Sequence, residues 1–442
     1  MTRMLVTGRI KFILGAVLIF FVSYLMKVNF VVPILLLSLG LFLKLTQKHN
    51  DLRSYNLLDL GLLFVIIFTS AYFIIHQAQS VFYIPFCVIP MLCVLLFNEL
   101  YVSLLLTIAA SLSIGSIAGG NFNLGLLFLT SGVISSMLVY GARKRSVIIR
   151  TGFIIGFIQA LTLLFIENFQ IQYWGSYSIL FTNGIACAII VVGILPVFEY
   201  LFKTVTNISL LELADFNHPL LQRMILEAPG TYHHSLIVGN LSDAACQAIG
   251  ANALLARIGA YYHDIGKLSK PEYFSENQAA NLKTKHDELA PSMSKLVIMN
   301  HVKEGVELAK KYKLNARLID FIQQHHGNSL VYYFYRRALE NSDQDQEVAE
   351  EGFRYSGPKP KTKEVAVVLL ADSVEAATRT LKEPSPASIE EIVHKVINNK
   401  FIDGQLDECD LTLKDMEEIA EVFIRILSGI YHSRITYPEN SK

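Results

Sequence analysis

Seven residues with imidazole or carboxylate side chains stand out in the second half of this chain. They are His234, His263, Asp264, His301, His325, His326 and Asp372. Nitrogen and oxygen donors of this kind suit iron, manganese and other divalent first-row metals rather than a soft thiolate site. Seven donors exceed what one ion usually takes when positions stay open for water and substrate. The set therefore predicts two metal ions.

Sharing Asp264 between two ions would use all the donors. One ion would be held by His234, His263 and Asp372, and the other by His301, His325 and His326. Two neighbouring ions suit phosphodiester hydrolysis, because a water between them loses its proton near neutral pH while the ions neutralise the phosphoryl oxygens. Lys267, one helical turn after His263, is predicted to stabilise the charge of the transition state. A plain surface lysine is the alternative.

Helices are predicted to position these donors, since apolar residues recur at helical spacing from Asn217 onward. The helix that begins near Ala251 is expected to finish in the stretch HDIGK. We expect His301 at the start of another helix.

The pair His325–His326 is predicted at a helix end, because adjacent residues on a helix point about 100° apart and Gly327 fits a helix stop. Asp372 falls on an apolar helix, with Glu375 one turn later and Arg379 two turns later. Pairing of Asp372 with Arg379 is an alternative to metal binding, and the two are compatible.

The composition divides the 442 residues into an apolar half and an ordinary globular half. The chain is 52% hydrophobic, with very few charges up to about residue 202. A formal net charge of +0 gives no general electrostatic basis for binding a nucleic-acid polymer. The five cysteines form no CxxC pair, so neither disulfides nor a thiolate site is predicted.

About eight apolar segments are predicted to cross a lipid bilayer, since most approach the ~20 residues that a spanning helix needs. They lie at 10–26, 29–45, 57–76, 79–97, 100–118, 122–140, 148–167 and 175–202. Lysine and arginine concentrate before the first, after the second and between the sixth and seventh segments. Cations are retained on the cytoplasmic side, so both termini are predicted to lie in the cytoplasm. The membrane is predicted to be the inner (plasma) membrane of the cell.

The resulting fold class is all-α, with a polytopic membrane domain followed by a helical cytoplasmic domain. The predicted divisions are 1–202 for the membrane domain, 203–217 for an amphipathic connector helix and 218–442 for the metal-binding domain.

The order of the donors resembles the HD-domain phosphohydrolase superfamily, and His301 with His325–His326 resembles its binuclear members. Longer stretches, among them LLELADFNHPLLQRMILEAPGTYHHS, GAYYHDIGK, SKLVIMNHVKEGVELA and ADSVEAATR, look like the seven-transmembrane HD family, the PgpH-type cyclic-di-AMP phosphodiesterases. This resemblance implies hydrolysis of cyclic di-AMP to pApA at a di-iron or di-manganese centre. The family's spacing also favours His234 over His233 as the ligand.

Members of this family usually carry a large extracytoplasmic domain after the first span, whereas only 27–29 lies there in this sequence. That departure leaves the predicted chemistry intact and puts in doubt a sensing role outside the cell. Weaker predictions concern contacts to the substrate, for which the alternative is a solvated basic loop. The candidate contacts are Lys267, Arg379, Arg354, Tyr355 and Lys359.

Two other functions remain open from the sequence. The same centre would serve cyclic di-GMP or another nucleotide equally well, and a receptor would bind the dinucleotide without cleaving it. A receptor that does not cleave would be expected to have lost some donors, whereas all seven are present. The oligomeric state stays open, with a homodimer as one arrangement.

Overall fold

The computed structural model describes residues 57–431 except 78, 279–284, 342–347 and 382, together with 32–34, 36–38 and 40. Over these residues the regular structure is helical, apart from an isolated bridge between Leu330 and Arg354. The chain divides into two compact units, Met1–Ile208 and Ser209–Lys442. The predicted all-α fold class is confirmed.

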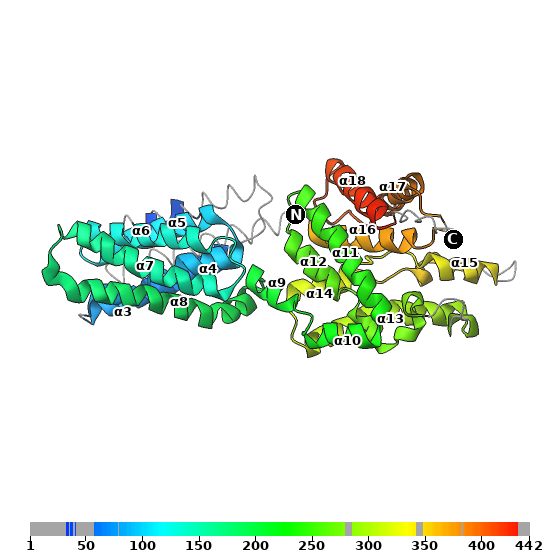
Figure 1. Cartoon of the computed structure of the whole chain (residues 1–442), viewed down its shortest axis with the longest axis horizontal. Helices are drawn as coiled ribbons and strands as arrows, with labels where there is room; N and C mark the ends of the chain where they lie inside the picture. The colour runs from blue at the N-terminus through cyan, green and yellow to red at the C-terminus, as the bar shows by residue number, and fades with distance from the viewer. Residues whose placement is uncertain are drawn as a thin grey trace, which may run out of the picture. The chain divides into compact units, whose positions relative to one another are not determined.

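Five apolar helices of the first unit are long enough to cross a membrane. They are α3 (Leu57–His76), α5 (Leu100–Ile117), α6 (Phe122–Val139), α7 (Arg145–Ile166) and α8 (Trp174–Phe202). The successive helices α5 to α8 pack side by side (Figure 1). The chain is thus a multi-pass membrane protein, as its apolar runs predict.

The prediction of one continuous spanning helix at 79–97 is wrong. A 3-10 turn, Val81–Tyr83, is followed by the helix α4 (Val88–Phe97), which has only 10 residues. Pro85 lies between them and has no amide hydrogen to continue a helical ladder. The predicted spans at 10–26 and 29–45 lie outside the described residues, except for 32–34, 36–38 and 40.

Small residues bring the membrane helices close together. A Cβ atom on Gly156 of α7 would lie 2.3 Å from the carbonyl oxygen of Phe181 on α8, so these backbones touch. Ser103 of α5 bonds Ser136 of α6 at 2.8 Å. Other hydroxyls in this unit bond the preceding turn of their own helix, as Thr107 does to the carbonyl of Ser103.

The second unit is a set of helices around α16. They are α9 (Asn207–Leu213), α10 (Pro219–Glu227), α11 (Pro229–Ala248), α12 (Ala253–Tyr262), α13 (Pro291–Lys311), α14 (Ala316–Gln324), α15 (Tyr332–Glu340), α16 (Lys363–Thr378), α17 (Pro386–Ile402) and α18 (Leu413–Ile430). The run from Val365 to Ala371 on α16 is wholly buried, and α11, α12, α14 and α17 pack against this helix (Figure 1).

The apolar run of α16 ends at Asp372, so the packing that buries the run carries a carboxylate into the interior. The helices around it begin at well-formed caps, since Asn252 accepts a hydrogen bond at the start of α12 and Thr412 forms a capping box at the start of α18. The helix α9 falls within the predicted connector 203–217, whose exact limits stay a prediction.

Candidate metal centre

The seven predicted donors meet inside the second unit. They form two groups whose ligand atoms lie within 4.8 Å of one another: His234, His263, Asp264 and Asp372 in the first, and Asp264, His301, His325 and His326 in the second. All are buried except His326, which is partly exposed. The two groups share Asp264, and together they form the donor set of a binuclear site.

Five chain segments supply these donors. His234 lies on α11, Asp372 on α16, and the His263–Asp264 pair in the turn between α12 and the 3-10 segment η3 (Ile265–Ser269). The predicted position of His301 at a helix start is wrong, because α13 begins ten residues earlier, at Pro291, and places His301 near its middle.

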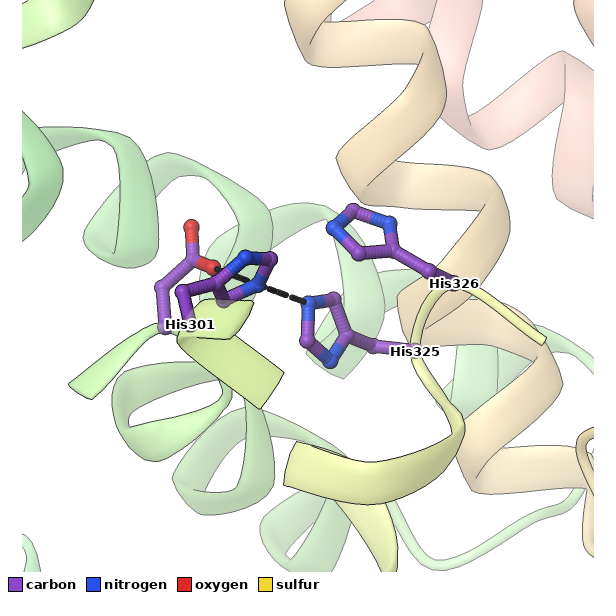
Figure 2. Close-up of side chains that lie close together, drawn as sticks. His301, His325 and His326 are labelled. Atoms are coloured by element: carbon purple, nitrogen blue, oxygen red, sulfur yellow. Dashed lines mark hydrogen bonds and ion pairs between the residues drawn. The ribbon is translucent and has the colours of Figure 1, made fainter. Parts of the chain in front are cut away.

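The adjacent imidazoles His325 and His326 end a helix, as predicted. α14 stops at Gln324, His325 is its C-cap, and Gly327 follows with a φ of 54°. A left-handed conformation of this kind suits glycine, which has no Cβ atom. Figure 2 shows His301, His325 and His326 converging, with Nε2 of His301 and Nε2 of His325 3.2 Å apart.

Asp264 lies between the two groups, with one carboxylate oxygen toward each. Its Oδ2 atom is 3.2 Å from Nε2 of His263, and its Oδ1 atom is 3.3 Å from Nε2 of His301. On the first side, Nε2 of His234 lies 3.0 Å from Oδ1 of Asp372. Asp264 is therefore the carboxylate that the two groups share.

Backbone carbonyl groups fix the orientation of three of the rings. Nδ1 of His263 donates to the carbonyl of Ala260 at 2.6 Å, and Nδ1 of His301 donates to that of Ile298 at 2.5 Å. Nδ1 of His325 donates to the carbonyl of Ile322 at 3.0 Å. A ring that donates from Nδ1 in its neutral form carries its lone pair on Nε2, which is the atom directed into the groups.

His234 is oriented by a carboxylate that sequence reasoning did not assign to the site. Its Nδ1 atom lies 2.6 Å from Oε2 of Glu375, a residue that is 1% exposed. Arg379 holds the same carboxylate at 2.6 Å through its Nε atom. The alternative in which Arg379 pairs with Asp372 is thus replaced by a chain from Arg379 through Glu375 to His234. The spacing of Glu375, one helical turn after Asp372, could have identified it from the sequence as a residue near the site.

Unsatisfied buried atoms at the centre fit the binding of cations. Among the described residues, Nε2 of His263 and both carboxylate oxygens of Asp264 have no hydrogen-bond partner of good geometry. Buried polar atoms are normally paired, and a metal ion would accept the lone pairs of both kinds of donor. The residues present therefore fit the ions that the sequence predicts.

Charges inside the centre alter the pKa values of its members. Burial opposes the charged form of His263, but the adjacent Asp264 raises the pKa of His263 to about 10. Burial and the neighbouring His325 hold the pKa of His326 well below its usual range.

Lys267 is held by two carboxylates. Its ammonium lies 2.7 Å from Oδ2 of Asp264 and 2.7 Å from Oε1 of Glu276. Although burial works in the opposite direction, these two charges raise the pKa of Lys267 and keep it cationic. Glu276, which the sequence interpretation did not select, also accepts a hydrogen bond from Thr231 at 3.2 Å.

Backbone contacts set the spacing of the turn that carries Asp264. A Cβ atom on Gly266 would lie 1.8 Å from the carbonyl oxygen of His301, so η3 and α13 meet main chain against main chain. Only glycine fits this approach. The contact places the shared carboxylate beside the second group of donors.

The remaining candidate substrate contacts differ in what they touch. The ring of Tyr355 stacks on that of His326, with centroids 4.4 Å apart. Arg354 pairs with Glu350 at 2.7 Å and Asp403 at 2.8 Å. Lys359 lies 3.2 Å from Asp407. Tyr355 is therefore adjacent to a donor, whereas the two cations are paired with carboxylates outside both groups.

Comparison with known proteins gives matches over both units. Residues 23–206 match the family described as 7TM receptor with intracellular HD hydrolase, and residues 231–377 match the HD domain. The protein named cyclic-di-AMP phosphodiesterase PgpH of Bacillus subtilis (strain 168) is 39% identical over 92% of this chain and 60% of its own length.

The cyclic-di-AMP phosphodiesterase PgpH of Listeria monocytogenes serotype 1/2a (strain 10403S) is 40% identical over 90% of this chain and 55% of its own length. A crystal structure of the L. monocytogenes PgpH HD domain in complex with cyclic-di-AMP is 47% identical, with a TM-score of 0.47, and covers 50% of this chain and 100% of that one. This chain thus spans a little over half the length of the two whole relatives.

Proposed function

Because the chain belongs to the family of 7TM receptors with an intracellular HD hydrolase, we propose that it is a membrane-anchored, metal-dependent phosphodiesterase that hydrolyses cyclic di-AMP to pApA. The observation that carries this proposal is the pair of donor groups that share Asp264. The names of the two relatives give the substrate proposed for this chain. Hydrolysis adds one water across one phosphodiester bond and opens the ring.

Two divalent ions, iron or manganese, are proposed to be held by the seven donors. When bound, such ions activate a water and neutralise the charge of the phosphoryl oxygens. The protein's own residues orient the donors. Asp264 is proposed as the carboxylate common to both ions, and Lys267 beside it places a positive charge at the reacting phosphate.

Tyr355 is proposed to contact the substrate where its ring extends from that of His326. Direct substrate contact by Arg379, Arg354 and Lys359 would require each to give up or share its carboxylate partner. Each of these pairs is a charge-assisted hydrogen bond that a substrate phosphate would have to replace. We therefore keep these three as secondary contacts in the proposal.

The site is proposed to face the cytoplasm, beneath an inner (plasma) membrane. Arg143 and Lys144 lie between α6 and α7, and Arg145 is the first residue of α7; a cationic stretch of this kind is retained on the cytoplasmic side. A homodimer is compatible with the proposal and is not required by it.

A turnover assay tests the proposed function. The full chain in detergent, loaded with manganese or iron and shown to contain metal, is expected to convert cyclic di-AMP to pApA. Cyclic di-GMP and mononucleotides in competition rank the substrates. Metal-loaded protein that binds cyclic di-AMP without cleaving it would support the receptor alternative. Cleavage of cyclic di-GMP alone would make cyclic di-GMP the substrate in place of cyclic di-AMP.

A further inference from the structure

The cations around the centre differ in whether they have an anionic partner. Each cation that the sequence analysis selected has a carboxylate within 3.2 Å: Lys267 has Asp264 and Glu276, Arg379 has Glu375, Arg354 has Glu350 and Asp403, and Lys359 has Asp407. An anionic substrate gains less from a cation that is already neutralised. A cation without an anionic partner near the centre would be the better contact.

Lys400 of α17 is such a cation. Its ammonium donates to the hydroxyl of Ser329 at 2.7 Å. Within the part of the chain that the structure describes, no carboxylate oxygen lies within 4.0 Å of this ammonium. Lys400 is partly buried, and a partly desolvated charge with only a neutral partner gains from the arrival of an anion.

Ser329 places Lys400 beside the second donor group. The amide of Ser329 donates to the carbonyl of His326 at 3.0 Å, and its carbonyl accepts from the amide of Tyr355 at 3.0 Å. His326 and Tyr355 stack on each other and form the partly exposed side of the centre. Lys400 therefore lies next to the part of the centre that a substrate can reach.

The electrostatic surroundings agree with this placement. Burial lowers the pKa of Lys400, while Asp372 and Asp403 act in the opposite direction and favour its charged form. Arg354, which pairs with Asp403, acts in the same direction as burial but is the smallest of these influences. Lys400 therefore has carboxylates in its wider surroundings that favour its charge, with none in direct contact among the described residues.

We propose that Lys400 binds the second phosphate of the dinucleotide, the one that is not being hydrolysed at the donor groups. Lys400 has no hydrogen bond or ion pair with any of the seven donors among the described residues. It is therefore placed for a different part of the substrate from the phosphate at the centre. A cyclic dinucleotide carries two phosphodiesters, whereas a simple diester carries one. This inference rests on the proposed function and makes Lys400 a specificity residue.

Substitutions at Lys400 test the inference in the full, metal-loaded chain. Lys400→Met removes the charge and the donor, and Lys400→Gln removes the charge but keeps a donor for Ser329. Both are expected to raise KM for cyclic di-AMP about tenfold or more, the scale of a charge-assisted hydrogen bond, with kcat and metal content unchanged. Hydrolysis of bis(p-nitrophenyl) phosphate, which has a single phosphodiester, should keep its wild-type kinetics. Lys395→Met, exposed on the same helix, is the matched control.

The outcomes separate the two proposals. Wild-type KM for cyclic di-AMP in Lys400→Gln, or an equal loss with both substrates, would overturn the role of Lys400 and leave the proposed function standing. A wild-type chain that cleaves only the simple diester would overturn the proposed function. The Kd for cyclic di-AMP, measured by calorimetry, would then test the role of Lys400 separately. An equal Kd in wild type and Lys400→Gln would reject the proposed contact.

Discussion

Most hydroxyl side chains of the membrane unit bond within their own helix, whereas the donors of the metal unit meet over long sequence distances. In the first unit, Ser131 bonds the carbonyl of Leu127, four residues before it. In the second, His234 meets Asp372 and Glu375, which lie 138 and 141 residues later. A local bond needs only its own helix, whereas a convergent centre needs the whole domain to fold. The effect of removing a polar group should differ accordingly between the two units.

The largest effect is expected from removing the donor that both groups share, together with the neighbouring imidazole. His263→Ala combined with Asp264→Ala deletes the bridging carboxylate and one imidazole, so metal content should fall to the level of a metal-free control and cyclic di-AMP hydrolysis to the background rate. Metal analysis and product chromatography measure the two. Retained metal with full activity in the double variant would show that the groups are not the catalytic centre.

A smaller effect is expected at Glu375, which touches no predicted ion. Glu375→Gln keeps the shape but removes the carboxylate that orients His234, and partners of this kind typically contribute about 10- to 100-fold in metal affinity. Competition with a chelator measures the loss. Glu391→Gln, exposed on α17, is the control. Unchanged affinity in Glu375→Gln would mean that packing alone orients the ring.

Metal affinity is also expected to depend on pH. Asp264 raises the pKa of His263 to about 10 in the metal-free chain, so this ring carries a proton at neutral pH that the ion must displace. Affinity should therefore rise as pH increases toward 10, by about tenfold per unit for each proton released. Calorimetry in buffers of different ionisation enthalpy counts the protons. Metal uptake without proton release at pH 7 would contradict this charge state.

The smallest effect is expected in the membrane unit. Ser103→Ala removes hydrogen bonds to Ser136 at 2.8 Å and to the carbonyl of Pro90 at 3.0 Å. Interhelical bonds of this kind average about 0.6 kcal/mol, so unfolding in detergent should shift only slightly and metal content not at all. A loss of metal in this variant would break the distinction between the two units.

The same distinction explains what could be predicted from the sequence. Apolar runs identified the membrane helices because length and composition act within one segment, and the run at 79–97 failed where a single proline interrupts it. The donors were selected by residue type and by the resemblance of their surroundings. The helix stop at Gly327 was predicted correctly from local conformation.

Partners that meet only through tertiary packing could not be predicted. Arg379 was expected near Asp372, but Glu375 is the carboxylate one turn away from it and takes the pairing. Lys400 has no motif around it, and its hydroxyl partner lies 71 residues earlier. His301 was placed too early in its helix because the residues before it, from Pro291, were not recognised as helical.

Gly266 limits how the centre can change. Because η3 and α13 touch through their backbones at this residue, the interval between Asp264 and His301 is set by main chain and cannot be adjusted by longer or shorter side chains. Changes around Ser329 or Tyr355 can therefore alter which molecule is held without altering the interval between the two donor groups. Gly266 thus fixes the distance between the two donor groups, while the residues on the substrate side of the domain can be substituted without changing that distance.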